Sequence, residues 1–436
     1  MNKAIGWSAL ACAALLGGCG NQASYTPTEQ SGANPPLPEA RNFLLPPMKV
    51  PGGVGWRAGQ TPKVAAGLRI EKIAGDLMHP RQLYVLPNGD VLVVETNGPG
   101  SEPVTTPKQL IAGKVKNRSG RGGKGGNRIT LLRHDATTDA WERHVFVEHL
   151  NSPFGVQLIG DTLYVANTDG IVAFPYVSGE TRITAPGAAF ADLPGTIDHH
   201  WTKALLASPD GRKLYVGVGS NSNITENGLA VEYRRAAVLE VDVATGGSRI
   251  FATGLRNPTG LQWEPQTARL WAIVNERDEI GADLVPDYLT SVQEGGFYGW
   301  PYSYFGQHVD TRVQPPRPDL VNKAIKPDYA LGSHVAALGL LFSTDNALPA
   351  SYHGGAFVSE HGSWNRKPLS GYRVVFVAFR QGKPVGVPQP VVTGFHSDDE
   401  STLYGAPVGL AQDKDGALLI ADDVGNVVWR VSADTR

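Results

Sequence analysis

The sequence has very little cysteine, and this limits the chemistry that the chain can carry. Of the 436 residues only two are cysteines, Cys12 and Cys19, and both lie within the first twenty. The rest of the chain can therefore form no disulfide bond and has no Cys-x-x-Cys-His motif for covalent haem. A redox enzyme with this sequence would have to pass its electrons to a separate acceptor.

The chain also lacks an excess of charge of either sign. It has 39 Lys and Arg against 41 Asp and Glu, a formal net charge of −2 at pH 7. Nucleic-acid binding usually needs a basic excess, so we expect no nucleic-acid partner. The chain is rich instead in glycine and proline, with 52 and 32 residues, which favours many short strands joined by tight turns.

Long hydrophobic runs are missing, apart from a short one at the start of the chain. Residues 1–19 combine one lysine, an apolar run and small residues, as in a secretory signal peptide. The run is too short for a comfortable membrane span. Its end, Leu-Gly-Gly-Cys, resembles a bacterial lipobox, which would leave Cys19 as a lipidated N-terminus. The alternative is an ordinary signal peptide that happens to contain a cysteine.

Residues 20–62 are rich in Pro, Ser, Gly and Asn with little apolar periodicity. This composition predicts a mobile tether between a lipid anchor and a folded domain at residues 63–436. With the signal sequence, it predicts a protein exported to the bacterial cell envelope, anchored by lipid and facing the periplasm. The only expected membrane contact is through that lipid.

Beyond the expected tether one pattern recurs: an apolar alternating strand, a tight turn and a second apolar strand. The copies lie at residues 83–95, 154–167, 205–220, 259–276, 339–362 and 408–423. Most are followed by a third strand, and several turns contain Asn-Gly or Asp-Gly, which tolerate the backbone angles of hairpins. Repeated units of this kind indicate propeller blades, so we predict an all-β, six-bladed β-propeller. Residues 68–75 would supply the outer strand that closes the ring.

Two insertions interrupt the repeats. Residues 98–126 are rich in Gly, Lys and Arg, which invites a phosphate or nucleic-acid interpretation. No strand-to-helix context or aromatic residues support that, and we expect a solvated flexible loop. Residues 297–328 are rich in proline and aromatic residues and predict a long loop over one rim.

Five acids follow the strand of the fourth repeat within a short stretch: Glu276, Asp278, Glu279, Asp283 and Asp287. Hard oxygen ligands on irregular backbone suit Ca²⁺, which takes about 6–8 oxygens in flexible geometry. The spacing is not that of an EF-hand. We predict calcium ligands at Glu276, Asp278, Asp283 and Asp287, with a solvated acidic loop as the alternative.

The motifs around this stretch carry a resemblance to a known family. GLRNPTGL (254–261), NERDE (275–279) and GGFYGWP (295–301) are similar to segments of the soluble quinoprotein glucose dehydrogenases and their sorbosone dehydrogenase relatives. That family has six-bladed propellers that use pyrroloquinoline quinone (PQQ) and calcium. The resemblance implies a dehydrogenase for a sugar or sugar-derived aldehyde, nearest the sorbosone branch, with an external quinone or cytochrome as electron acceptor.

The resemblance also assigns roles to individual residues. His200 falls where the family has its catalytic histidine, and a neutral imidazole is a natural general base at neutral pH; His199 is the alternative. Arg256 and Asn257 match the family's arginine–asparagine pair, which binds the cofactor, with Arg256 also stabilising charge on the quinone. The alternative is a structural Arg256 that ties down neighbouring blade loops.

Further cofactor-binding candidates follow the second strand of the fifth repeat. Arg366 and Lys367 could bind cofactor carboxylates and Trp364 could stack on its rings, or the three could form an exposed turn. Arg81 and Glu95 are rim candidates without independent support. The sequence departs from the glucose enzymes in lacking a clear cofactor-binding lysine in this blade and in having extra residues in the acidic stretch.

Two other functions fit the predicted architecture, because a fold does not determine a function. One is a metal-dependent lactonase, which would need acids from several blades to converge on an axial metal. The other is a binding propeller without catalytic activity in the cell envelope.

Overall fold

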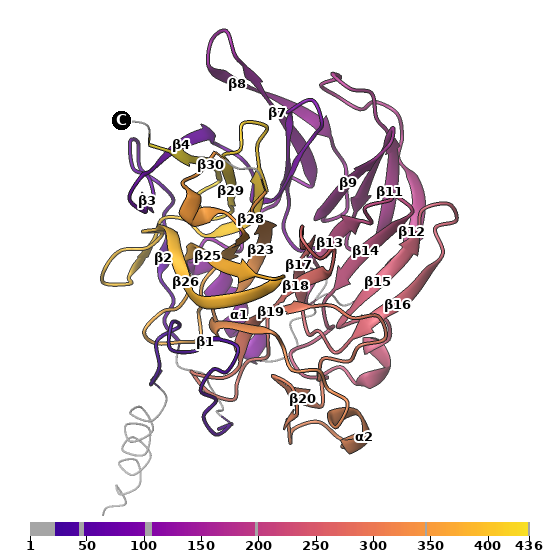
Figure 1. Cartoon of the computed structure of the whole chain (residues 1–436), viewed down its shortest axis with the longest axis vertical. Coiled ribbons are helices and arrows are strands. Elements are labelled where there is room, and N and C mark those ends of the chain that lie inside the picture. Colours follow the sequence, from indigo (N-terminus) through magenta and orange to yellow (C-terminus); the bar gives the residue numbers. More distant parts are fainter. Residues whose placement is uncertain (1–21, 43–47, 101–106, 197–198, 345–346, 435–436) are drawn as a thin grey trace, which may run out of the picture.

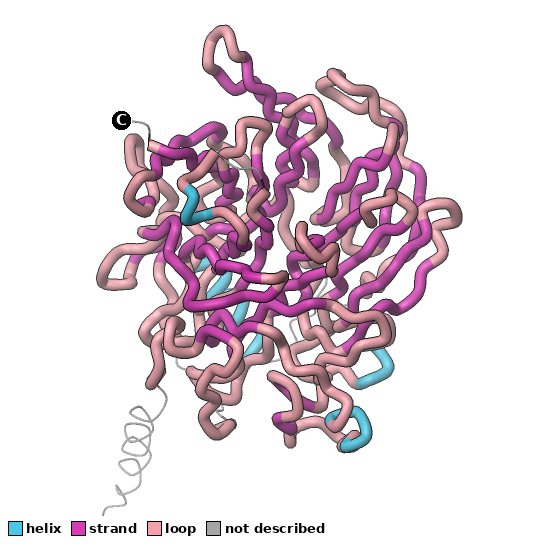
Figure 2. Tube along the Cα trace, in the orientation of Figure 1, coloured by secondary structure: helices cyan, strands magenta, loops and turns pink. Residues whose placement is uncertain are grey.

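The computed structural model describes residues 22–42, 48–100, 107–196, 199–344 and 347–434. The predicted signal peptide, Cys12 and Cys19 lie outside these residues. Strands dominate the described chain and helix is confined to short segments (Figures 1 and 2). No described helix is long and apolar enough to span a bilayer.

The strands form six sheets that follow one another along the chain, and each sheet is one blade of the predicted propeller. Blade 1 contains β5 (Pro80–Val85), β6 (Val91–Glu95), β7 (Arg128–Asp135) and β8 (Ala140–Val147). Blade 2 contains β9 (Gly155–Ile159), β10 (Thr162–Ala166), β11 (Gly170–Pro175) and β12 (Ala188–Asp192). Blade 3 contains β13 (Lys203–Ala207), β14 (Lys213–Val218), β15 (Ala237–Asp242) and β16 (Ser248–Thr253).

The last three blades each include a strand from the beginning of the chain. Blade 4 contains β17 (Pro258–Trp263), β18 (Leu270–Val274), β19 (Pro286–Ser291), β22 (Tyr329–Ser333) and β1 (Ser31–Gly32). Blade 5 contains β23 (Ala337–Phe342), β24 (Gly355–Glu360), β25 (Arg373–Arg380), β26 (Lys383–Thr393) and β3 (Lys63–Val64). Blade 6 contains β28 (Pro407–Gln412), β29 (Leu418–Asp422), β30 (Val427–Ala433) and β4 (Leu68–Ala74).

The remaining elements are short. They are α1 (Pro107–Arg118), α2 (Pro318–Val321), two 3₁₀ turns (Leu229–Glu232 and Ala350–Tyr352) and the strand pairs β2 (Gly52–Gly53) with β27 (Thr402–Leu403) and β20 (Ser303–Tyr304) with β21 (His308–Val309). The last pair and α2 occupy the expected loop at residues 297–328.

The core lies between the blades. The described residues contain six hydrophobic clusters, and each draws its side chains mainly from two neighbouring blades. In β6, Leu92 and Val94 pack towards blade 2, whereas Val91 and Val93 pack towards blade 6. Successive side chains of a strand point to opposite faces, and both faces are covered here. This explains why the second strand of each repeat is an unbroken apolar run.

The ring closes by pairing the two ends of the domain. β4 is the outer strand of blade 6 and pairs antiparallel with β30, from Leu68 opposite Ala433 to Ala74 opposite Val428. The predicted closing strand at 68–75 is thereby confirmed. Both ends of the propeller are tied by backbone hydrogen bonds, and no blade is left with an uncovered face.

The inner strands β5, β9, β13, β17, β23 and β28 surround a common axis. Side chains from all six line an axial cavity of about 310 Å³, with Gln82, Gln157, Gln262 and Gln412 among them. Because each inner strand is antiparallel to the next strand of its blade, the inner strands begin where the second strands end. We call this end the upper face; it carries Arg81, His200, Asn257, His361 and Asp423.

The segment predicted as a mobile tether is packed on the propeller wherever the structure describes it. We call residues 22–42 and 48–62 the N-terminal strap. β1 extends the sheet of blade 4, and β2 pairs with β27. The indole of Trp56 packs against the cluster between blades 5 and 6, and its N–H donates to Asp422 Oδ2 at 2.7 Å. The tether prediction is wrong for these residues, because edge-strand pairing and one aromatic anchor need no apolar periodicity.

The insertion between β6 and β7 also differs from the expected flexible loop. It contains α1 and reaches blade 5 on the upper face. Arg121 Nη2 donates to the carbonyl oxygens of His361 and Gly362 in blade 5, at 3.1 and 3.0 Å. Ser119 is buried against Gly53 of the strap. Backbone carbonyls and glycine contacts hold this segment, and neither produces a hydrophobic signal in the sequence.

Replacing Trp56 with alanine tests whether the strap is part of the fold. Loss of a large aromatic side chain from a packed site costs about 3 kcal/mol and here also removes a hydrogen bond to Asp422. We expect Trp56→Ala to lower the urea midpoint of unfolding, whereas Val54→Ala, at a side chain that is 64% exposed, leaves it unchanged. Equal midpoints for both variants would show that the strap behaves as a tether.

Candidate functional site

His200 lies on the upper face just before β13 and is oriented by the end of β14. Its Nδ1 lies 3.0 Å from the carbonyl oxygen of Ser220 and 2.9 Å from Ser220 Oγ. The Ser220 hydroxyl donates its own proton to the carbonyl of Ser222 at 2.7 Å. Both Ser220 oxygens therefore accept, so Nδ1 carries the imidazole proton and Nε2 keeps a free lone pair.

The surroundings of His200 keep its imidazole neutral. Burial, and next the positive charge of Arg256, hold the pKa of His200 well below its ordinary value. His199 lies beside it, with ring centroids 4.6 Å apart and the planes nearly perpendicular. A neutral imidazole with a free Nε2 can accept a proton at neutral pH.

Asn257 faces the same place as His200, and Gly219 lies between them. A Cβ atom at Gly219 would lie 2.5 Å from His200 Cβ and 2.4 Å from Asn257 Oδ1, so only glycine fits there. Asn257 Oδ1 is buried and has no hydrogen-bond partner within the described chain. A buried amide oxygen without a partner costs stability and indicates a site that a ligand can complete.

Arg256 is buried and bound to the protein. Its guanidinium donates to two oxygens of Asn223, the backbone carbonyl at 3.2 Å and the side-chain Oδ1 at 2.8 Å. It also donates to the carbonyl of Glu276 at 2.6 Å and lies 3.6 Å from Asp278 Oδ2. These contacts support a structural role for Arg256, because they fix the start of the acidic stretch. They also hold the positive charge of Arg256 near His200.

The four predicted calcium ligands point to separate partners. Glu276 Oε2 pairs with the fully buried Arg277 at 3.0 Å, and Asp287 accepts the backbone N–H groups of Glu276 and Ala336 at 2.8 and 2.7 Å. Burial raises the pKa of Asp287 to about 7. Asp283 pairs with Arg366 at 3.0 Å.

Asp278 has its own partners. Its Oδ1 accepts a hydrogen bond from Asn365 at 2.7 Å and lies 3.4 Å from His334 Nδ1. Burial acts in the opposite direction, but the hydrogen bond to His334 and the charge of Arg256 hold the pKa of Asp278 well below its usual range.

No group of three or more His, Cys, Asp or Glu side chains in the described chain is arranged to hold a metal ion. Glu276, Asp278, Asp283 and Asp287 do not converge as one ligand set in this structure, and calcium binding by them stays a prediction. Each of these carboxylates has internal partners of its own, although Glu276 Oε1 is buried without one, and spacing in the sequence cannot reveal such pairings. The convergent acids that a metal-dependent lactonase would need are likewise not found in the part of the chain that the structure describes.

Arg366 and Lys367 follow β24 and are predicted to bind the cofactor, but the structure places neither of them at His200. Arg366 is fully buried and donates to Asp283 and to the carbonyls of Ala282 and Tyr25, so it fastens the acidic stretch to the strap. Lys367 is exposed. Trp364 is half-buried, and its carbonyl accepts the N–H of Lys49 at 3.1 Å.

Further charged or titratable residues lie on the upper face: Arg81, Arg121, His361 and Asp423. The sequence alone assigns no role to the last three and gives Arg81 only as an unsupported candidate. Asp423, after β29, accepts from Arg81 at 2.6 Å and lies 2.8 Å from His361 Nε2. The Arg81 guanidinium lies 5.7 Å from the ring of Trp201, the residue after His200. The Nε atoms of Arg81 and Arg121 are buried without a partner among the described residues. Arg81, His361 and Asp423 lie at the start of an inner strand or the end of a second strand, and this shared position is the signal that could have found His361 and Asp423 and supported Arg81.

Glu95, the other rim candidate, has a structural role. It forms a two-pronged ion pair with Arg128 at 2.9 and 3.0 Å and accepts a hydrogen bond from Thr130. These contacts bind the second and third strands of blade 1.

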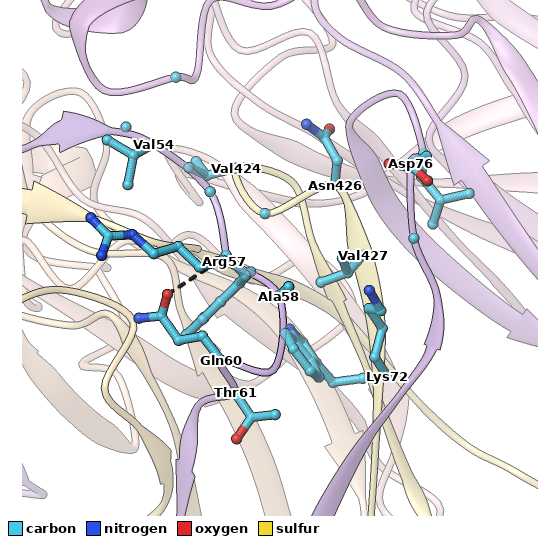
Figure 3. A pocket seen from close by; sticks show the side chains of 18 of the residues that line it. Val54, Arg57, Ala58, Gln60, Thr61, Lys72, Asp76, Val424, Asn426 and Val427 are labelled. Carbon is cyan, nitrogen blue, oxygen red and sulfur yellow. Dashed lines mark hydrogen bonds between the residues drawn. The ribbon is translucent and has the colours of Figure 1, made fainter.

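A separate pocket of about 760 Å³ lies between the strap and the junction of blades 6 and 1. Figure 3 shows Arg57, Gln60 and Thr61 of the strap with Lys72, Asp76 and Asn426 around the same cavity. It contains neither His200 nor Asn257. Because the chemically suited groups are on the upper face, we place the candidate site there and not in this pocket.

Comparisons with known proteins agree with this fold. The sequence model described as TrAA12-like matches residues 121–292 and 319–434. An uncharacterized protein of Borreliella burgdorferi is 27% identical over 299 residues, covering 66% of this chain and 77% of that protein. A pyrroloquinoline quinone-dependent pyranose dehydrogenase of Coprinopsis cinerea is 23% identical over 357 residues, covering 72% of this chain but only 44% of the relative.

Solved structures share the architecture. A Trichoderma reesei enzyme of carbohydrate-active family AA12 superposes with a TM-score of 0.69 at 18% identity, over 90% of this chain and 100% of that one. The holo PQQ domain of the Coprinopsis cinerea pyranose dehydrogenase gives 0.67 at 19% identity, over 88% and 100%. The PQQ-bound aldose sugar dehydrogenase of Streptomyces coelicolor gives 0.55 at 15%, over 86% and 100%. At these identities the likeness establishes the fold, a six-bladed propeller as predicted.

Adjacent residues allow a matched test of the structural role of Arg366. Removing one partner of a buried ion pair costs about 3–5 kcal/mol, because the other charge is left buried alone. We expect Arg366→Ala to lower the free energy of unfolding in urea by that order, and Lys367→Ala to leave it within about 0.5 kcal/mol. If Arg366→Ala were as stable as the wild type and lost only PQQ binding, Arg366 would belong to the cofactor site.

Proposed function

The chain belongs to the TrAA12-like family, and we propose that it is a PQQ-dependent dehydrogenase that oxidises a sugar or a sugar-derived aldehyde, as a sorbosone or aldose dehydrogenase does. The observation that carries this proposal is the neutral His200, with Nε2 free, on a face where several buried polar atoms lack partners. The PQQ-dependent relatives named above support the same chemistry.

The residues of the upper face fit PQQ, a planar group with several carboxylates. The unpartnered Nε atoms of Arg81 and Arg121 can donate to carboxylates, and arginine keeps its charge at any working pH. The side-chain amide of Asn257 offers a further polar group beside His200. We assign cofactor binding to Arg81, Arg121 and Asn257, and the half-buried Trp364 stays a stacking candidate.

When bound, PQQ supplies a two-electron oxidant that accepts hydride from the sugar carbon. His200 then acts as the general base: its Nε2 takes the proton of the hydroxyl on that carbon, or of a hydrated aldehyde. Ser220 holds the ring in the tautomer that this step needs. Arg256 acts electrostatically, since its buried charge favours the neutral state of His200 before the proton arrives.

The carboxylates of the acidic stretch do not fit calcium as one ligand set, and we assign no step to a metal. The electrons leave to an external acceptor, a quinone or a cytochrome, because the chain outside its first twenty residues has no cysteine. We further propose that the chain is exported to the bacterial cell envelope and held there, facing the periplasm, by a lipid on Cys19.

Substituting His200 tests the catalytic assignment. General-base catalysis typically contributes a factor of about 10²–10⁴, so we expect His200→Ala to lower turnover with an artificial electron acceptor by that factor. The affinity for PQQ, followed by quenching of tryptophan fluorescence, should change little, because the arginines bind the carboxylates. The assay uses the PQQ-loaded protein with a panel of aldoses and sugar aldehydes.

His199→Ala is the matched control. If it abolished turnover while His200→Ala did not, the base would be His199. If no sugar were oxidised and PQQ did not bind, the dehydrogenase proposal would fail and a binding propeller of the cell envelope would take its place.

A further inference from the structure

The segment that reaches blade 5 on the upper face is strongly basic. We call residues 110–128 the basic cover. Its cationic residues are Lys114, Lys116, Arg118, Arg121, Lys124 and Arg128, and it has no Asp or Glu. The whole chain has nearly equal numbers of basic and acidic residues, so this is a local concentration of positive charge.

Among the cationic side chains of the basic cover, only the arginines bind other residues of the described chain. Arg128 pairs with Glu95, Arg121 donates to blade 5, and Arg118 Nε donates to the carbonyl of Val50 at 3.1 Å. The three lysines form no ion pair with any residue that the structure describes, and Lys114, Lys116 and Lys124 are exposed. The arginines thus fasten the segment, while the lysines keep their charges free for a ligand.

The basic cover lies close to the reacting group. The charge of Lys116 is one of those that lower the pKa of His200. Gly98 precedes the basic cover in the chain and lies against Trp201, the residue after His200: an added Cβ would lie 2.8 Å from the indole ring. At the other end, Gly120 contacts blade 6 at Val424. The N–H groups of Arg121 and Gly122 donate to the carbonyl of Lys116 at 3.0 and 3.1 Å, and Arg121 binds blade 5, so Lys116 lies at the end of the cover that is fastened to the upper face.

The carboxylates of the upper face do not offset these lysines. Asp423 is bound to Arg81 and His361, Asp278 to His334 and Asn365, and Glu95 to Arg128. A cleft lined by one sign of charge concentrates ligands of the opposite sign and speeds their association.

We propose that the preferred substrate is an anionic sugar, a monosaccharide bearing a carboxylate or phosphate away from its oxidised carbon, and that Lys116 of the basic cover recognises this charge. The inference deepens the proposed function and rests on it. The reacting end lies at His200, and the charged end faces the lysines, so the basic cover acts as a specificity determinant and takes no part in the proton transfer.

Three sugars of the same skeleton test the proposal. D-glucuronate carries a carboxylate at C6, D-glucose 6-phosphate a phosphate, and D-glucose neither. With PQQ-loaded protein at low ionic strength, we expect kcat/KM for at least one anion to exceed that for glucose about tenfold or more. The advantage should shrink at 0.15 M salt, where charges are screened beyond about 8 Å. Whichever anion is preferred identifies the charged group.

Variants locate the effect. Lys116→Gln should lower the ratio of kcat/KM for the anionic sugar to that for glucose about three- to tenfold. Lys116→Arg, which keeps the charge, should retain it. Lys383→Gln makes the same change at an exposed lysine on β26 of blade 5 and should leave the ratio unaltered.

Calorimetric binding of the three sugars to the same proteins separates the possible failures. Oxidation of glucose with no preference for either anion overturns the inference and leaves the dehydrogenase standing. A loss of PQQ affinity in Lys116→Gln at an unchanged sugar ratio also overturns it, since the lysine would then serve the cofactor. If no sugar is oxidised but glucuronate binding depends on Lys116, the anion site stands and the proposed function fails.

Discussion

The structure depends on one constraint: each blade buries both faces of its sheet, so no blade is stable until it is covered on both sides. An open row of six sheets would leave one apolar face exposed at each end, and the pairing of β4 with β30 removes both ends at once. Once the ring is closed, the starts of the inner strands and the ends of the second strands have fixed places on the upper face. Loops that carry function can then diverge without loss of the scaffold.

On that face, stability and chemistry make different demands on charged groups. Most of the buried charges are paired internally, as Arg277 is with Glu276 and Arg366 with Asp283, because an isolated buried charge is costly. A few polar atoms have no such partner, among them the Nε atoms of Arg81 and Arg121 and Oδ1 of Asn257. They lie on the same upper face as His200, whose tautomer and neutral state are already set by Ser220, burial and Arg256. A bound polar cofactor would offset the cost of leaving them unpaired.

The scaffold could be predicted from the sequence because its signals are local. Alternating or unbroken apolar runs and Gly-containing turns recur with each blade, and even the closing strand at 68–75 was recognisable. The strap was not, because β1 pairs through its backbone and Trp56 anchors the segment alone. The candidate site was only partly predictable: a resemblance placed His200 and Asn257 on the upper face, whereas the acids after β18 and Arg366 looked like ligands because spacing cannot tell an internally paired charge from a free one. Arg121 was missed because its partners are distant backbone carbonyls.

The central claim is that the upper face binds PQQ and passes it electrons from a sugar. An anaerobic titration in the absence of any acceptor tests this most directly. The account predicts that one PQQ binds per chain and that adding a reactive sugar converts the oxidised quinone absorbance to that of the reduced form in a single turnover. A protein that binds no PQQ, or whose bound PQQ stays oxidised with every aldose and sugar aldehyde tried, would contradict it.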